Sequence, residues 1–230
     1  MAFRMGRAAI GAALAAALCV AGLACSRDDA SAGGTGTAKA RQGTKGKGVE
    51  FTHETAFQRI RIEAEAANAI ESDDALPAVG GKVMRVADDP GAAGGKCVWI
   101  PDKAGTPEPD PKSGVPPKFA RAVYKFKIAV PGNYTFWVRR KWQDSCGDTL
   151  YVRFNKEGAR HTDAFICGSD DSSEVPKWGW SPVWEEGQPR QFFLAAGEHV
   201  LEILNREDGP RFDVILLTDD PGYLPQGMEE

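Results

Sequence analysis

The sequence predicts an all-β fold, a two-sheet antiparallel sandwich, over residues 55–222. Apolar and polar residues alternate in many short segments, which is the pattern of strands with one face in a core and the other in solvent. Turn signals rich in Gly, Pro and Asn separate these segments. No long segment has the apolar stripe of an amphipathic helix. Many short strands in one domain of this size are typical of a β-sandwich.

The strand candidates follow one another along the whole domain. The clearest alternation places Tyr134, Phe136 and Val138 on one face of a strand and Thr135 and Trp137 on the other. Turns are marked by Gly80-Gly81, Pro131-Gly132-Asn133, Lys156-Glu157-Gly158 and Ala196-Gly197-Glu198. The expected strands are 58–66, 82–87, 96–100, 119–128, 132–142, 148–154, 162–167, 190–194, 198–204 and 211–217.

The first 25 residues are expected to be a targeting segment that takes no part in the fold. Arg4 and Arg7 precede an Ala-rich apolar run that ends at Gly22-Leu23-Ala24-Cys25. This ending resembles the bacterial lipobox, with Gly22 in place of the usual Leu, and the resemblance implies lipidation of Cys25. Residues 26–54 hold almost no apolar side chains and are expected to form a flexible linker. Residues 223–230 are expected to be a short tail.

Three cysteines lie inside the predicted domain, at Cys97, Cys146 and Cys167. Export implies an oxidising compartment, so one disulfide and one free thiol are expected. Cys146 and Cys167 flank a predicted hairpin, whose ends lie close together, and this favours a bond between them. The alternative is three buried free thiols.

Acidic residues alternate with apolar ones near both ends of the domain. If the first and last strands lie side by side, Glu63, Glu65 and Asp213 can converge. Carboxylates this close repel one another unless a hard cation joins them, and Ca²⁺ prefers oxygen ligands of this kind. The sequence therefore predicts a structural calcium ion. The alternative is that these carboxylates face water or pair with nearby arginines, which are Arg61, Arg206 and Arg211.

Composition and motifs argue against two functional classes. The formal net charge is −4, and it becomes −6 without Arg4 and Arg7, which disfavours general nucleic-acid binding. No nucleophile elbow, HExxH sequence or Gly-rich phosphate loop is present. The three histidines, His53, His161 and His199, are spread along the chain and form no catalytic motif. The sequence therefore predicts a protein that is not an enzyme.

The order of several segments resembles the carbohydrate-binding modules of families 6 and 35, which have a galactose-binding-like jelly-roll fold. The resemblance spans nearly all of residues 58–222. The matching segments are Ile62-Glu63-Ala64-Glu65, Pro131-Gly132-Asn133-Tyr134-Thr135-Phe136-Trp137-Val138-Arg139-Arg140, Asp148-Thr149-Leu150-Tyr151-Val152, Trp178-Gly179-Trp180, Leu194-Ala195-Ala196-Gly197-Glu198-His199, Arg206-Glu207-Asp208-Gly209 with Asp213, and Leu217-Thr218-Asp219-Asp220-Pro221.

The resemblance implies roles for particular residues. Two Glu of the first strand and an Asp of the last hold a calcium ion in the family, and these positions are Glu63, Glu65 and Asp213 here. A stacking aromatic lies in the region of Trp178 and Trp180, ahead of a core Trp that matches Trp184. Sugar rings present C–H faces that stack on such aromatic side chains. Trp178 and Trp180 have the same parity on an extended segment, so both rings are expected on one face.

Other residues qualify this assignment. Arg140 and Trp142, at the end of a strand, are expected to add a charged donor and a second ring to the site. Many members carry an Asn in the loop before the last strand, where this chain has Asp208-Gly209-Pro210. Each Trp can alternatively be a core residue.

Two hypotheses of function follow. The first is a non-catalytic lipoprotein of the bacterial cell envelope that binds a polysaccharide or glycan and contains structural Ca²⁺. The second is a structural or adhesive sandwich that binds another envelope protein and has no sugar site. In both hypotheses the chain is exported. It is then either secreted or held at a membrane through its lipid anchor only. The Ser26 that follows Cys25 favours the outer membrane.

Overall fold

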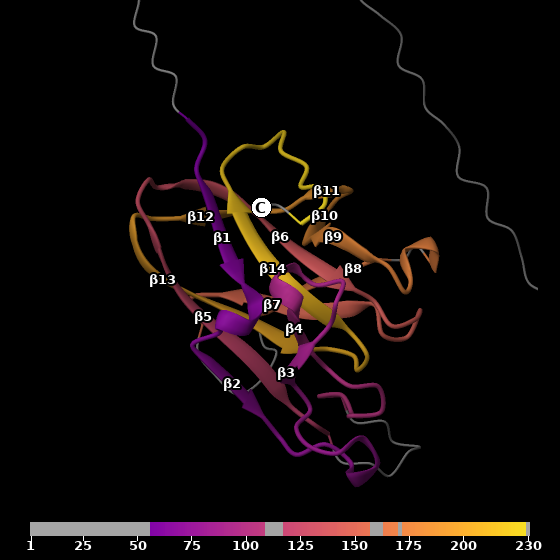
Figure 1. The fold of residues 1–230 in the computed structure, drawn as a ribbon. Coiled ribbons are helices and arrows are strands. Elements are labelled where there is room, and N and C mark those ends of the chain that lie inside the picture. The colour runs from indigo at the N-terminus through magenta and orange to yellow at the C-terminus, as the bar shows by residue number, and fades with distance from the viewer. Residues whose placement is uncertain (1–55, 109–116, 157–162, 170–171, 229–230) are drawn as a thin grey trace, which may run out of the picture. The chain divides into compact units, whose positions relative to one another are not determined.

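The computed structural model describes residues 56–108, 117–156, 163–169 and 172–228, all of them within a compact unit that spans residues 53–230. These residues form two packed antiparallel sheets with short 3₁₀ turns between strands (Figure 1). The predicted targeting segment 1–25, including Cys25, and the predicted linker 26–54 lie outside the described residues. Among the helices in the described part of the chain, none has the length and apolar character needed to cross a membrane.

The first sheet has seven strands and contains both ends of the domain. Its main order is β12 (Gln191–Leu194), β6 (Gly132–Lys141), β14 (Arg211–Thr218), β4 (Lys96–Trp99) and β3 (Arg85–Asp88). In addition, β1 (Arg59–Glu63) pairs with β14, and β9 (Trp178–Pro182) pairs with β6.

The second sheet has five strands, in the order β2 (Ala69–Ser72), β5 (Ala120–Ile128), β13 (Gly197–Asn205), β7 (Thr149–Phe154) and β8 (Phe165–Gly168). A separate two-stranded hairpin joins β10 (Trp184–Glu185) to β11 (Gln188–Pro189). The 3₁₀ helices are η1 (Ala64–Ala66), η2 (Pro77–Val79), η3 (Ala93–Gly95) and η4 (Ser172–Glu174). The prediction of an all-β, two-sheet antiparallel fold is confirmed.

The core lies between the two sheets and follows the predicted alternation. On β6, Tyr134, Phe136 and Val138 face inward and are at most 1% exposed. They meet apolar side chains of the five-stranded sheet, among them Tyr124, Val152 and Ile203. The opposite face of β6 carries Thr135, Trp137, Arg139 and Lys141.

The first and last strands lie side by side, as predicted. β1 runs antiparallel to β14, from Arg59 opposite Thr218 to Glu63 opposite Val214. Ile60 and Ile62 pack against the core, which leaves the intervening residues of β1 on the outer face. The strand ends at Glu63 rather than at residue 66, because η1 begins at Ala64.

The predicted disulfide between Cys146 and Cys167 is wrong for this structure, in which both are free thiols. Cys167 lies on β8 opposite Leu150, and the alternation of the strand turns its side chain into the core. Its Sγ lies 3.3 Å from the carbonyl oxygen of Pro182. Cys146 is exposed in the loop that joins β6 to β7, beyond the end of the paired region.

Candidate functional site

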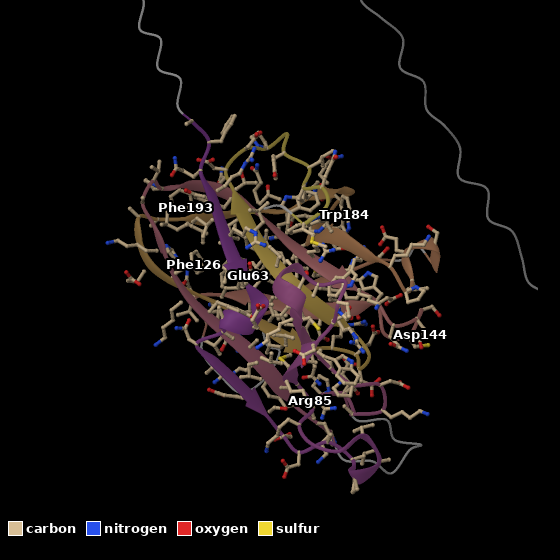
Figure 2. The ribbon with its side chains drawn as sticks, viewed as in Figure 1. Glu63, Arg85, Phe126, Asp144, Trp184 and Phe193 are labelled. Carbon is tan, nitrogen blue, oxygen red and sulfur yellow. The ribbon has the colours of Figure 1, made fainter. Side chains whose placement is uncertain are left out.

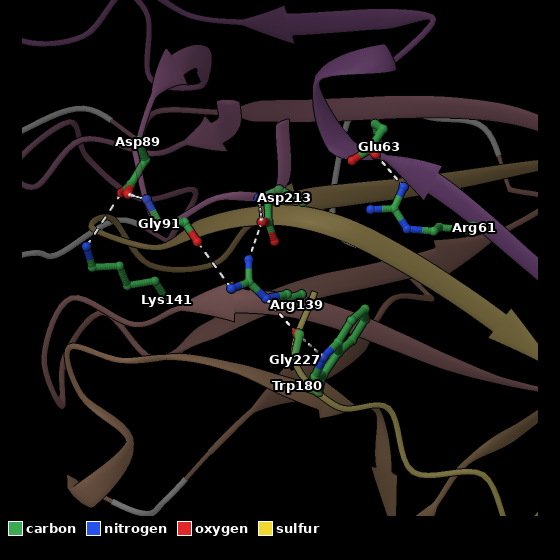
Figure 3. Close-up of polar contacts among 10 residues, drawn as sticks. Arg61, Glu63, Asp89, Gly91, Arg139, Lys141, Trp180, Asp213 and Gly227 are labelled. Carbon is green, nitrogen blue, oxygen red and sulfur yellow. Dashed lines mark hydrogen bonds and ion pairs between the residues drawn. The ribbon is translucent and has the colours of Figure 1, made fainter. Parts of the chain in front are cut away.

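The predicted metal ligands lie on the outer face of the seven-stranded sheet and beside it. Glu63 ends β1, Glu65 lies in η1, and Asp213 lies at an irregularity in the pairing of β14 with β6. Glu63 pairs with Arg61, as the alternative reading of the sequence expected (Figure 3). Asp213 pairs instead with Arg139, which the sequence did not indicate.

Asp213 is fully buried and bonded by more than one donor. Its Oδ2 accepts hydrogen bonds from Arg139 and from the backbone N–H of Ala93, the latter at 2.6 Å. Burial raises the pKa of Asp213, and the bonds from Ala93 and Arg139 oppose that shift only in part. Removing Arg139 would leave a buried charge without its partner, at a cost of about 3–5 kcal/mol.

Each of the three predicted ligands has one buried oxygen that no described group satisfies. These atoms are Glu63 Oε2, Glu65 Oε2 and Asp213 Oδ1. Unsatisfied carboxylate oxygens are the donors that a hard cation needs, so the donor chemistry fits calcium. The distances between these side chains do not fit a shared ion, because no three acidic, His or Cys side chains of the described residues lie close enough to hold a metal together.

A second buried acid lies on the same face. Asp89 pairs with Lys141 and Arg211 and accepts a hydrogen bond of 2.9 Å from the backbone N–H of Gly91 (Figure 3). Burial alone would raise the pKa of Asp89, but the Gly91 bond and the two cations lower it below its ordinary value. These contacts fix the loop between β3 and η3 against the sheet.

The predicted aromatic pair lies on one face of β9. Trp178 is opposite Lys141 and Trp180 is opposite Arg139, so the equal parity expected from the sequence is present. Both rings are partly covered. The guanidinium of Arg139 lies 4.8 Å from the ring centre of Trp178. Trp180 Nε1 donates to the carbonyl oxygen of Gly227 at 3.1 Å (Figure 3).

Two other predicted ligand residues face the core instead. Trp142 is 0% exposed and belongs to the apolar core. Arg140 is 1% exposed, donates to Ser181 and pairs with Glu174. The parity of β6 explains this, because both positions share a face with Val138. Their assignment to a ligand site is therefore wrong.

The prediction that Trp184 is a core residue is also wrong. Trp184 is 53% exposed on β10, whereas its neighbour Val183 is 2% exposed (Figure 2). Trp142 provides the buried indole that Trp184 was expected to provide.

A groove of about 810 Å³ lies on the outer face of the seven-stranded sheet. Thr135 and Trp137 of β6, both almost fully buried, are among its lining residues. The β10–β11 hairpin, the start of β12 and the chain beyond β14 provide the rest of its surface. The lining residues are Thr135, Trp137, Glu185, Glu186, Gln188, Pro189, Gln191, Pro221, Gly222, Tyr223 and Leu224.

The hairpin beside the groove has a tight two-residue turn. Glu186 and Gly187 both have positive φ, at 50° and 79°. Positive φ at both central residues is the requirement of a type I′ turn, which suits the twist of two short strands. The turn presents Glu185, Glu186 and Gln188 to the groove.

The C-terminal segment (residues 219–228) folds back along the same face. Asp219 accepts a hydrogen bond from the backbone N–H of Gln58 at 2.6 Å, and the Arg59 guanidinium lies 3.8 Å from the ring centre of Tyr223. Farther along, the carbonyl oxygen of Gly227 accepts bonds from both Trp180 and Arg139. The segment therefore packs on the sheet, and the domain continues past residue 222.

The chemistry of the groove is mixed aromatic and polar. Trp137 and Tyr223 supply rings, Gln188 and Gln191 supply amides that both donate and accept, and the hairpin supplies carboxylates. Sequence reasoning missed this site because its residues come from three separated segments. The signal that could have found it is Glu186-Gly187 between two short extended runs, which marks a hairpin that was not among the expected strands.

Comparisons with known proteins add the following. No family model matches the chain. An uncharacterized protein named P23 from Formosa agariphila is 30% identical over 120 residues, and the match covers 49% of this chain and 28% of that protein. The chain thus spans less than a third of the length of this relative.

Among solved structures, the chain resembles a Podospora anserina family 26 β-(1,4)-mannanase with a family 35 carbohydrate-binding module, at TM-score 0.47, 15% identity, and coverage of 73% of this chain and 29% of that one. It also resembles the C-terminal family 6 module of a Zobellia galactanivorans laminarinase, with a TM-score of 0.42 and 11% identity. The match covers 70% of this chain and 99% of that module. A family 6 module of Cellvibrio mixtus lichenase 5A, solved with cellotriose, matches with a TM-score of 0.41 and 15% identity. The match covers 69% of this chain and 95% of that module. Modules of the two families that the sequence resembles are therefore among the structures that this chain resembles.

Proposed function

We propose that this domain binds an oligosaccharide segment of a glycan in the groove, without cleaving it. The observation that carries the proposal is the groove itself, which combines rings, amides and carboxylates on a rigid sheet. A volume of about 810 Å³ falls within the range of about 300–1,000 Å³ that is usual for ligand sites.

The donor and acceptor set of the groove suits sugar hydroxyls. A hydroxyl both donates and accepts, so it can pair with the amides of Gln188 and Gln191 and donate to the carboxylates of the hairpin. The Tyr223 ring is held in place by Arg59, which lowers the entropy lost when a sugar stacks beside it. Such a site can hold its ligand by contact area and hydrogen bonds.

The experiment is a glycan array with the full chain, followed by calorimetry on any glycan retained. Gln188→Ala and Tyr223→Ala are expected to weaken binding by about tenfold or more, because each removes a direct contact. Trp178→Ala with Trp180→Ala tests the predicted aromatic pair in parallel. Lys125→Ala, on the exposed side of the five-stranded sheet, is the matched control and should bind as the wild type does.

Two outcomes oppose the proposal. An array without signal, together with a protein partner recovered by pull-down, would favour the adhesive module that binds another envelope protein. If mass spectrometry detects shortening of an oligosaccharide incubated with the protein, the domain cleaves its ligand.

Calcium is proposed as a structural ion of this domain. The support is the set of three unsatisfied carboxylate oxygens on Glu63, Glu65 and Asp213. When bound, the ion would join the end of β1 and η1 to β14 and remove the cost of burying those oxygens. The glycan site does not depend on it, because none of these carboxylates lines the groove.

Export and lipid anchoring through Cys25 are proposed from the sequence, since this residue lies outside the described part of the chain. The protein expressed in a bacterial host is expected to incorporate labelled palmitate. The Cys25→Ala variant should incorporate none and should be released from the membrane fraction. Equal labelling of the two proteins would contradict the anchor.

A further inference from the structure

The groove carries a net negative charge that glycan binding alone does not explain. Glu185 and Glu186 line it, and none of its lining residues is Lys, Arg or His. Both carboxylates lie at the turn of the β10–β11 hairpin, where they are exposed to solvent. Because Glu185 pairs with Arg190, a ligand in the groove would meet the unpaired charge of Glu186 and no positively charged lining residue.

The nearest cations are engaged elsewhere. Arg190 pairs with Glu185, but its guanidinium carbon lies 4.2 Å from the ring centre of Phe165, which does not line the groove. Arg59 lies against the ring of Tyr223 and is likewise absent from the lining. No basic side chain of the described residues pairs with Glu186. The charge of Glu186 is thus left for a ligand.

A second, independent feature lies at the base of the groove. Trp137 is 5% exposed and contributes to the lining, and its indole Nε1 has no acceptor among the described residues. A buried donor without a partner is costly, and an acceptor oxygen from a bound molecule would compensate it. The groove therefore has an unpaired carboxylate at its hairpin side and an unpaired indole N–H beneath its base.

We infer that the groove selects oligosaccharides that contain unacetylated amino sugars, in preference to neutral or anionic chains. This inference rests on the proposed glycan binding at the same groove. A protonated amino group would donate to Glu186, while hydroxyl and ring oxygens would accept from Trp137 and from the amides of Gln188 and Gln191. A uronate or sulfate in the same position would face the like charge of Glu186, and its binding would be opposed.

The test compares three pentasaccharides of similar length by calorimetry with the full chain: glucosamine, N-acetylglucosamine and galacturonate. The measurements are made at a pH of about 5.5, at which the sugar amine is protonated. The glucosamine chain is expected to bind about tenfold more tightly than the acetylated chain, and the galacturonate chain most weakly. Raising the salt concentration should narrow these differences, since the carboxylates are exposed.

The decisive variant is Glu186→Gln, which keeps the shape of the side chain and removes its charge. It should reduce the preference for glucosamine over N-acetylglucosamine to about twofold or less, with the affinity for the acetylated chain unchanged. Glu198→Gln, an exposed carboxylate on β13 of the other sheet, is the matched control and should keep the full preference. Loss of the preference in both variants would overturn the inference, because it would indicate a general effect of net charge.

Failure of this inference and failure of the proposed function give different results. If the acetylated chain binds as tightly as the glucosamine chain and Tyr223→Ala weakens both, the groove binds glycans but the selection for amines is wrong. If no oligosaccharide binds, or if Tyr223→Ala and Gln188→Ala leave binding unchanged, both ideas are wrong.

Discussion

The three cysteines in the described part of the chain differ in how far water reaches their sulfur atoms. Burial raises the pKa of Cys167 to about 12 and that of Cys97 to about 11, whereas Cys146 is exposed in a loop. The thiolate is the reactive form, so a buried thiol with a raised pKa is inert near neutral pH. The reactivity of each sulfur thus depends on whether its residue is buried on a strand, as Cys97 and Cys167 are, or lies in an exposed loop, as Cys146 does.

We predict that brief treatment of the native protein with iodoacetamide at pH 7.5 modifies Cys146 and spares Cys97 and Cys167. Peptide mapping by mass spectrometry is the measurement. In denaturant all three should react, which serves as the control. A Cys146–Cys167 disulfide in purified protein would appear as a linked peptide and would contradict the structure.

Individual tryptophans show what residue-level prediction can and cannot do. The equal parity of Trp178 and Trp180 followed from strand geometry and is present in the pairing with β6. The burial of Trp142 could have been predicted from the same geometry, because it shares a face with the core residue Val138. The exposure of Trp184 could not, because it depends on how the short β10–β11 hairpin packs against the rest of the domain.

At the scale of elements, the C-terminal segment does more than extend the last strand. The carbonyl oxygen of Gly227 accepts hydrogen bonds from Arg139 and Trp180 of the sheet, and Pro225 of the segment is buried. It also provides the part of the groove surface formed by Tyr223 and Leu224. Stability and ligand binding are thus coupled in one short segment.

Truncation after Gly222 should therefore lower the free energy of unfolding by about 1–3 kcal/mol, because Arg139 and Trp180 lose an acceptor. A fall in Tm of a few degrees is expected for a domain of this size, measured by calorimetry. Glycan binding should weaken as well. Leu224→Ser is the matched control for stability, since its side chain is 67% exposed and should melt as the wild type does. An unchanged Tm after truncation would show that the segment is only loosely attached.

Element boundaries were predicted well where the strands are long and poorly where local turns intervene. The strands around Tyr124 and Tyr134 are close to their expected positions, because their alternation extends over many residues. The first strand was expected to include Glu65, but Ala64–Ala66 form a 3₁₀ turn. A single turn of this kind leaves no periodic signal, so the parity argument for Glu65 did not hold.

At the scale of the whole molecule, two distant parts of the chain are joined by the β1–β14 pair. The calcium prediction depended on this pairing, and the structure contains it. The groove was not predictable in the same way, because it requires the relative positions of a hairpin, the strands β6 and β12 and a returning chain end. The fold class could be predicted from the local alternation of residues, whereas the groove depends on how distant segments pack together.

If calcium joins these two ends, it should stabilise the entire domain. We predict that EDTA lowers Tm and that added Ca²⁺ restores it; a ligand at about 100 times its Kd contributes about 2.7 kcal/mol. Differential scanning calorimetry is the measurement. A Glu63→Gln/Glu65→Gln double variant should melt at one temperature with or without Ca²⁺. A wild-type melt that chelator does not change would remove the metal from the description of this protein.

The antiparallel register of β1 also has a mechanical consequence. Each residue from Arg59 to Glu63 is paired with β14, and backbone hydrogen bonds run perpendicular to the strands. A pull on the chain ahead of Arg59, directed along β1, therefore loads these bonds together in shear instead of opening them one at a time. β14 passes the load to β6, the strand beneath the groove. Tension between the amino-terminal side and a held ligand would thus run through the centre of one sheet, where the domain resists extension best.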